Sequence, residues 1–235
     1  MKILRFTLLL LCTPLLLYAQ SQPLRVPDFP ADRYVGGDTA FYRFFAQNLR
    51  YPASARHAGI IGTAILGFTL LPNGELTDIE LVNPLSKDLD NEIKRVFSET
   101  AGNWFPSSQA LPVRMYLPIA YTLDGVPLIR AEINDKLFIE EIIMKAFGRV
   151  QATVKPSAKL IDKLYKFIEK EKHRKALHFA DELIRRDPFN KQWFLMRSTI
   201  HKEMGDAEAV CSDLKKIQDL LQYPVSDKLV REYCQ

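Results

Sequence analysis

The fold is decided by residues 51–82, which read YPASARHAGIIGTAILGFTLLPNGELTDIELV. The stretch opens on Tyr51 and Pro52, and a proline biases the residue before it toward an extended backbone. Residues 53–58 then predict one or two turns of helix, which end at Gly59 because glycine favours helix C-termini. A short helix therefore leads into the rest of the stretch.

An antiparallel hairpin is expected after this helix. Residues 60–71 are an apolar run rich in Ile, Thr and Phe, and the glycines within the run argue against a helix. Pro72, Asn73 and Gly74 predict a turn, because Asn and Gly tolerate positive φ. A second strand begins at Leu76, so we expect two strands with one buried face.

Two longer helices are expected, one before the hairpin in the sequence and one after it. Asp38 is a suitable N-cap for a helix over residues 39–49. Asp88 or Asp90 can begin the second helix, and Gly102 ends it. We interpret the apolar faces of both helices as core: Phe41, Phe44, Phe45, Leu49, Ile93, Val96 and Phe97.

A last strand is predicted over residues 113–123, where apolar side chains alternate with others at the period of a half-buried strand. Pro118 interrupts this strand. Because proline lacks the N–H group that a sheet ladder uses, it predicts an edge position or a bulge.

The order of these elements resembles that of the TonB C-terminal domain. The resemblance covers residues 29–124 and rests on an ordered set: Phe29-Pro30, Gly36-Gly37-Asp38, Tyr51-Pro52, Ala55, Gly59, Gly62, Asn73-Gly74, Leu76, Leu89-Asp90 and Trp104-Phe105-Pro106. It implies an α+β fold for residues 28–124, with two helices against a three-stranded antiparallel sheet.

The resemblance also implies a binding role. In this family the domain meets outer-membrane transporters, whose short periplasmic segment pairs with the last strand, while residues next to the Tyr-Pro motif touch the same partner. By position, the implied partner-binding residues are Asn48, Arg50, Tyr51, Val113, Arg114, Met115, Tyr116, Leu117, Ile119 and Tyr121. The alternative for Val113, Met115 and Leu117 is that they serve as core on one face of the strand.

The N-terminus predicts export. Lys2 and Arg5 form a positive region, residues 6–17 an apolar region, and Leu17-Tyr18-Ala19 a cleavage site, so residues 1–19 are expected to be a signal peptide cut after Ala19. A retained anchor is the alternative, but the apolar run is shorter than the roughly 20 residues that span a bilayer. We expect a periplasmic protein without a membrane span, which begins with an extended segment over residues 20–27.

This N-terminus departs from the family. Energy-transducing TonB proteins carry an uncleaved inner-membrane helix and a long proline-rich spacer ahead of the domain. We therefore do not expect coupling to the proton-motive force.

Charge and cysteines narrow the function further. Removal of the signal lowers the net charge from +4 to +2, and we interpret the charges as solvated helix faces without a nucleic-acid-binding block. Cys211 and Cys234 remain in the mature chain, and export makes a disulfide between them plausible. Two buried free thiols are the alternative.

The C-terminal part is predicted to be helical. Residues 125–156 read as a connecting segment with one helix over 135–147, and residues 157–235 resemble tetratricopeptide (TPR) repeats. The packing positions of the first unit are Leu160, Leu164, Phe167, Ala176, Ala180, Leu183 and Pro188. Five helices are expected, over 157–170, 173–186, 191–204, 207–221 and 226–233. Because repeat stacks need three or more units, two units and a cap must pack against another part of the chain, and the helix predicted at 135–147 or the sheet domain is the expected neighbour.

The sequence offers no chemistry for catalysis. The four histidines include no pair at i, i+4, and no Cys/His cluster has zinc-ligand spacing. Phosphate loops, dinucleotide fingerprints and nucleophile elbows are absent from it. We expect no enzyme, metal site, cofactor or nucleic-acid partner.

Two binding functions remain. The first is a periplasmic adaptor that engages an envelope protein segment, such as one from a TonB-dependent outer-membrane transporter, by strand addition. The alternative is a TPR-type scaffold whose concave helical face binds a partner protein.

Overall fold

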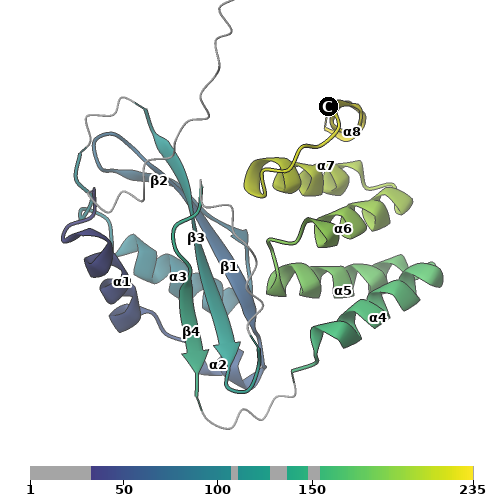
Figure 1. The fold of residues 1–235 in the computed structure, drawn as a ribbon, viewed down its shortest axis with the longest axis horizontal. Coiled ribbons are helices and arrows are strands. Elements are labelled where there is room, and N and C mark those ends of the chain that lie inside the picture. The colour runs from purple at the N-terminus through teal and green to yellow at the C-terminus, as the bar shows by residue number, and fades with distance from the viewer. Residues whose placement is uncertain (1–32, 107–110, 128–136, 148–153, 235) are drawn as a thin grey trace, which may run out of the picture.

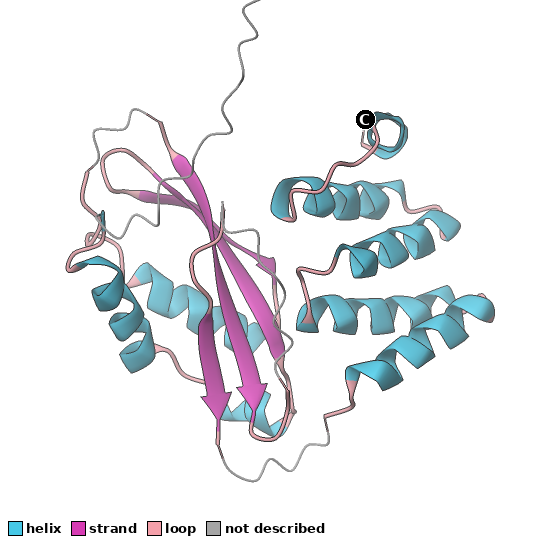
Figure 2. Cartoon of the chain, viewed as in Figure 1, coloured by secondary structure: helices cyan, strands magenta, loops and turns pink. Residues whose placement is uncertain are grey.

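The computed structural model describes residues 33–106, 111–127, 137–147 and 154–234. The predicted signal peptide (1–19) and extended N-terminus (20–27) lie outside these residues. Within them, a β-sheet lies between two groups of helices (Figures 1 and 2). We call residues 33–147 the sheet part and residues 154–234 the helical part.

The sheet has four strands in the order β2-β1-β3-β4. The predicted hairpin is confirmed as β1 (Gly62–Leu70) paired antiparallel with β2 (Leu76–Asn83). The predicted last strand is β3 (Val113–Leu123), antiparallel to β1. The expected three-stranded antiparallel sheet is therefore present, but a fourth strand adds to it in parallel.

This fourth strand corrects the helix predicted over residues 135–147. Among the described residues of that range, Ile142–Ala146 form β4 instead. The side chains of Ile139 and Ile142 are only 2% and 8% exposed, because pairing with β3 carries them onto the sheet's core. Tertiary pairing has overridden local helix propensity here.

One face of the sheet is covered by α1 (Gly37–Asn48), α2 (Ala53–His57) and α3 (Lys87–Ser98). The helices lie close to their predicted bounds, but the predicted N-caps are wrong. The N-cap of α1 is Gly36, and Asp38 lies in the first turn of the helix. The N-cap of α3 is Ser86, whose hydroxyl accepts a hydrogen bond from the Leu89 N–H at 3.5 Å. The predicted core residues Phe41, Phe45 and Phe97 are fully buried.

The helical part covers the other face of the sheet. It consists of α4 (Ser157–Glu169), α5 (His173–Arg186), α6 (Lys191–Glu203), α7 (Ala207–Lys215), the π-helical turn η2 (Lys216–Leu220) and α8 (Asp227–Tyr233). All five predicted helices are thus confirmed. Figure 1 shows α4 to α7 stacked with their ends toward the sheet.

A second core joins the two parts. Ile65 of β1 packs in one cluster with Phe194, Ile184 and the η2 residues Ile217 and Leu220. The expected hairpin with one buried face is therefore wrong for β1, whose residues are almost all buried. The repeat-like helices pack on the sheet, one of the two neighbours expected for them, and the sheet supplies the surface that two repeat-like units lack.

Candidate functional site

The candidate site is the edge of β3, where the sequence predicted that a partner strand adds. In the structure the chain's own residues 137–146 occupy most of this edge. The Tyr116 N–H donates to Leu137 O at 3.0 Å, and the Ile139 N–H donates to Tyr116 O at 2.8 Å. Further along, β4 pairs with β3 from Ile119 opposite Ile142 to Leu123 opposite Ala146.

Pro118 marks an irregularity in this pairing. Tyr116 is opposite Phe138 and Ile119 is opposite Ile142. An advance of three residues along β3 therefore corresponds to an advance of four residues along the segment 137–146 that pairs with it. Backbone N–H groups alternate in direction along a strand, so position 118 faces β4 as Tyr116 does, and proline has no N–H to donate. The predicted edge position is wrong, since β3 lies between two strands, but the pairing is irregular at this residue.

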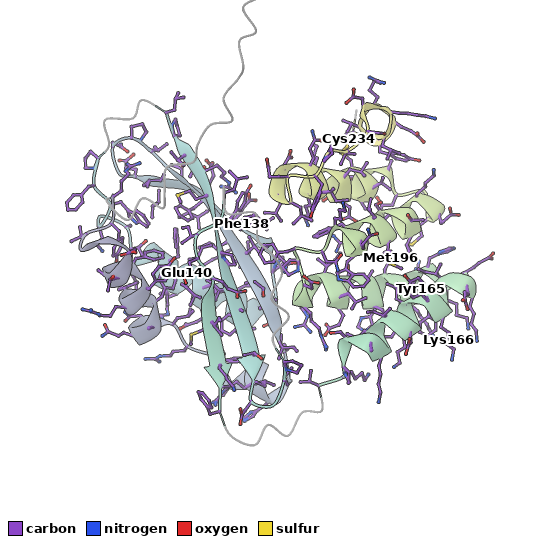
Figure 3. All side chains as sticks on the ribbon, viewed as in Figure 1. Phe138, Glu140, Tyr165, Lys166, Met196 and Cys234 are labelled. Carbon is purple, nitrogen blue, oxygen red and sulfur yellow. A yellow bond between two sulfur atoms is a disulfide. The ribbon has the colours of Figure 1, made fainter. Side chains whose placement is uncertain are left out.

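The added segment is held from both faces of the sheet. On the α1 side, Ile139 and Ile142 enter the sheet's core. On the other side, the Phe138 ring packs against Tyr116 at 5.5 Å and Phe189 at 5.3 Å. Figure 3 shows Phe138 directed toward the helical part and Glu140 near α1. The segment therefore closes the edge with side-chain anchors as well as hydrogen bonds.

The predicted binding residues on β3 divide between the two faces. Met115 and Leu117 are buried in the core beneath α1 and α3, as the alternative interpretation held, and Ile119 and Tyr121 are buried there too. Val113, which that interpretation also placed in the core, is partly buried against it. Val113, Arg114 and Tyr116 are half-buried. The Arg114 guanidinium pairs with Glu80 and lies 5.3 Å from the centre of the Tyr116 ring. None of these side chains is fully exposed, so a partner strand at this edge would meet mainly their backbone.

The Tyr-Pro motif lies beside the C-terminal half of β3, where Tyr51 contacts Tyr121. The ring of Tyr51 meets Tyr121 edge to face at 5.0 Å, and its hydroxyl donates to Ile60 O. Burial raises the pKa of Tyr51 to about 12, and it raises the pKa of the Tyr121 phenol as well. Both phenols therefore stay neutral at physiological pH, and this pair contributes packing and polarity without charge.

The Asn48 side chain is held within its own helix, α1, whereas the Arg50 backbone is tied to α3. The Asn48 side-chain amide donates to Phe44 O at 2.8 Å, and the Arg50 N–H donates to the Glu92 carboxylate at 3.0 Å. Of the predicted site residues near the motif, only Tyr51 is brought into contact with β3 by a ring contact. The sequence analysis assigned residues 137–146 to a helix and not to this edge, and the adjacent β-branched residues Ile142 and Ile143 were the available signal for a strand.

The described residues contain no group of three or more His, Cys, Asp or Glu side chains placed to hold a metal ion. Among the helices described, none combines the length and the apolar character needed to cross a membrane.

The comparisons with known proteins agree with the sheet part. Residues 47–123 match the family model described as the Gram-negative bacterial TonB protein C-terminal. Two curated relatives, the TonB proteins of Helicobacter pylori strains 26695 and J99, are 34% identical to this chain over 74 residues. The chain spans about a quarter of the length of these relatives, 26% of each, and the match covers 32% of the chain.

Two solved structures are similar to the same region. Both are NMR solution structures of the Helicobacter pylori TonB C-terminal domain, at 30% and 27% identity and a TM-score of 0.30 each. They cover 35% and 36% of this chain, and 76% and 90% of their own lengths. On the sequence match, residues 47–123 are similar to the TonB C-terminal domain family.

Proposed function

We propose that this protein is a non-catalytic, periplasmic TonB-like binding protein that acts in transport across the cell envelope. It takes up a short strand of a TonB-dependent outer-membrane transporter at the β3 edge of its sheet. The partner strand replaces residues 137–146, which occupy that edge in the free protein. The TonB C-terminal family match supports the class of protein and partner.

The observation that carries this proposal is the occupied edge itself. A sheet edge presents unpaired N–H and C=O groups that accept an added strand from any chain. Here the β3 edge already pairs with a segment of the same chain. The apolar side chains of Ile139 and Ile142 anchor that segment in the core. The β3 edge is therefore competent to bind a strand. A partner strand would compete for it with residues 137–146 of the same chain.

The length of β4 makes exchange feasible. Regular pairing with β3 extends over only five residues, Ile142–Ala146, and the register slips beside Pro118. A partner segment that also pairs along residues 113–115, beyond the bridge at Tyr116, could gain backbone hydrogen bonds that residues 137–146 do not make. Each such net gain is worth about 1 kcal/mol.

The test compares two isoleucines that are neighbours in β4. Ile142→Asp places a charge where the side chain is 8% exposed, whereas Ile143→Asp changes a side chain that is 39% exposed. Burying an Ile side chain contributes about 1.5–3 kcal/mol, so the first change should release β4 by at least about tenfold relative to the second. Hydrogen exchange at the Tyr116 amide reports the release, and exchange in β1 reports that the sheet stays folded.

Binding is measured by retention of identified TonB-dependent transporters from outer-membrane extract on each immobilised protein. We expect Ile142→Asp to retain more transporter than the wild type, and Ile143→Asp to match the wild type. Release of β4 without a gain in retained transporter would contradict strand exchange at this edge.

A further inference from the structure

The free end of the helical part carries a concentration of positive charge. Residues 155–175 contain eight Lys or Arg against three Asp or Glu, while the net charge of the whole chain is only +4. From the sequence alone these charges were interpreted as solvated helix faces. The structure shows that several of them are aligned.

Four lysines form a line along α4, and we call them the lysine stripe: Lys159, Lys163, Lys166 and Lys170. Their spacing of four, three and four residues keeps them within a narrow sector of the helix, since each residue turns the helix by about 100°. At about 1.5 Å of rise per residue, the stripe is about 16 Å long. Lys163 is half-buried, and the other three side chains are exposed.

The stripe is not neutralised within the described part of the chain. None of its lysines lies within ion-pair distance of a described carboxylate, although Arg185, Arg186 and Arg197 elsewhere in the helical part all form ion pairs. Asp162 and Glu169 are on the same helix but pair with no stripe lysine at that distance. The ammonium groups therefore remain available to an external anion.

A pair of aromatic rings fixes one side of the stripe. Phe167 and Phe179 are stacked at 5.5 Å with 5° between their planes. The Lys163 ammonium lies 5.4 Å from the centre of the Phe179 ring, and the Lys175 ammonium lies 5.7 Å from that of Phe167. Cation–π contacts of this kind orient an ammonium group without cancelling its charge.

The stripe lies away from the surface that joins the two parts. Figure 1 places α4 at one end of the helical stack, and Figure 3 shows Tyr165 and Lys166 on the side of the stack remote from the sheet. Tyr165 is 52% exposed. A ligand could therefore occupy the stripe without displacing β4.

We propose that the lysine stripe binds an acidic helical segment of a partner protein. A helix with carboxylates at the same four-three-four spacing lies alongside α4 with each carboxylate opposite a lysine, because both helices rise at the same rate. A single row of cations fits a linear ligand of this kind. A flat anionic membrane would extend beyond the row and also meet Asp162 and Glu169, which lie together on one side of the row and repel it. This surface is independent of the proposed strand exchange.

The test uses two labelled alanine-based peptides of identical composition. One carries glutamates at the stripe's spacing on one helical face, and the other distributes the same glutamates around the helix. Affinities for the mature protein are measured by fluorescence anisotropy at low and at physiological ionic strength. Sedimentation with phosphatidylglycerol vesicles is measured in parallel.

The variant replaces three exposed stripe lysines, as Lys159→Gln, Lys166→Gln and Lys170→Gln together. Its matched control removes three exposed lysines elsewhere, as Lys87→Gln, Lys94→Gln and Lys228→Gln together. We expect the one-faced peptide to bind more tightly than its isomer, and the stripe variant to lose roughly tenfold in affinity at low salt while the control loses little.

Equal binding of the two peptides, or an equal loss in both variants, would overturn the proposal, because the interaction would then follow net charge alone. Vesicle binding that exceeds peptide binding and is lost in the stripe variant would also overturn it, in favour of a membrane surface. Transporter retention through the β3 edge is expected to be unchanged in the stripe variant, so failure of either proposal can be recognised separately.

Discussion

At the scale of single residues, Gly62 decides how closely the two parts approach. Its φ is +141°, and a Cβ added there would lie 2.2 Å from Arg185 O. The Arg185 side chain also donates to the carbonyl of Ile61, so the end of α5 is fixed against the start of β1. From the sequence, Gly62 is one residue of the TonB C-terminal pattern. The structure adds a second reason for a glycine here, because the end of α5 leaves no room for a Cβ.

Gly62→Ala is expected to lower the free energy of unfolding by at least about 2 kcal/mol, because backbone strain adds to a clash with a backbone oxygen. Gly102→Ala is the matched control, since Gly102 also has positive φ (+81°) but no atom within 4 Å of an added Cβ. Denaturant unfolding measures both. Equal losses in the two variants would mean that conformational strain alone, and not contact with α5, sets the cost.

At the scale of elements, α8 is held in a different way from the other helices. None of its residues is buried, yet a disulfide joins Cys234 at its end to Cys211 of α7. The bond closes a loop with a sequence separation of 23, which also contains η2. In the chain-entropy model, closure of such a loop stabilises the fold by about 3 kcal/mol.

Cys234→Ser is therefore expected to lower the free energy of unfolding by up to about 3 kcal/mol and to speed hydrogen exchange in α8 first. Reduction of the wild-type protein should reproduce both effects, and the same reductant should leave the variant unchanged. A variant with wild-type stability and protected α8 amides would show that packing alone holds this helix.

The element that sequence reasoning misjudged is β4. Residues 137–147 contain Glu, Lys, Met and Ala as well as Ile, so local propensity allows either a helix or a strand. The helices α4 to α7, by contrast, were placed within two residues of their ends, apart from the π-helical turn that completes the last of them. Their apolar periodicity is strong and local, whereas the pairing of β4 depends on a distant edge.

At the scale of the whole molecule, the sheet and helical parts share a core. Phe194 at the start of α6 is 1% exposed and packs in the cluster that contains Ile65 of β1. We therefore expect the two parts to unfold together in the mature protein, since removing either exposes the apolar face of the other.

Phe194→Ala should lower the free energy of unfolding by about 3–5 kcal/mol. Leu195→Ala, at a neighbouring side chain that is 37% exposed, should cost less than about 1 kcal/mol and serves as its control. Unfolding is followed by tryptophan fluorescence, with Trp104 in the sheet part and Trp193 in the helical part. Two separate transitions in the wild-type protein would contradict a shared core.

The sequence by itself determined the hairpin, the flanking helices, the last strand, the C-terminal helices and the TonB C-terminal resemblance. Each of these follows from local periodicity, turn residues or ordered motifs, which act over a few residues. Only the tertiary structure decided that β4 closes the β3 edge, that β1 is buried on both faces and which of its two expected neighbours the helical part packs on. These features arise from contacts between distant segments, whose free energy is absent from any local pattern and is gained only when the chain brings both surfaces together.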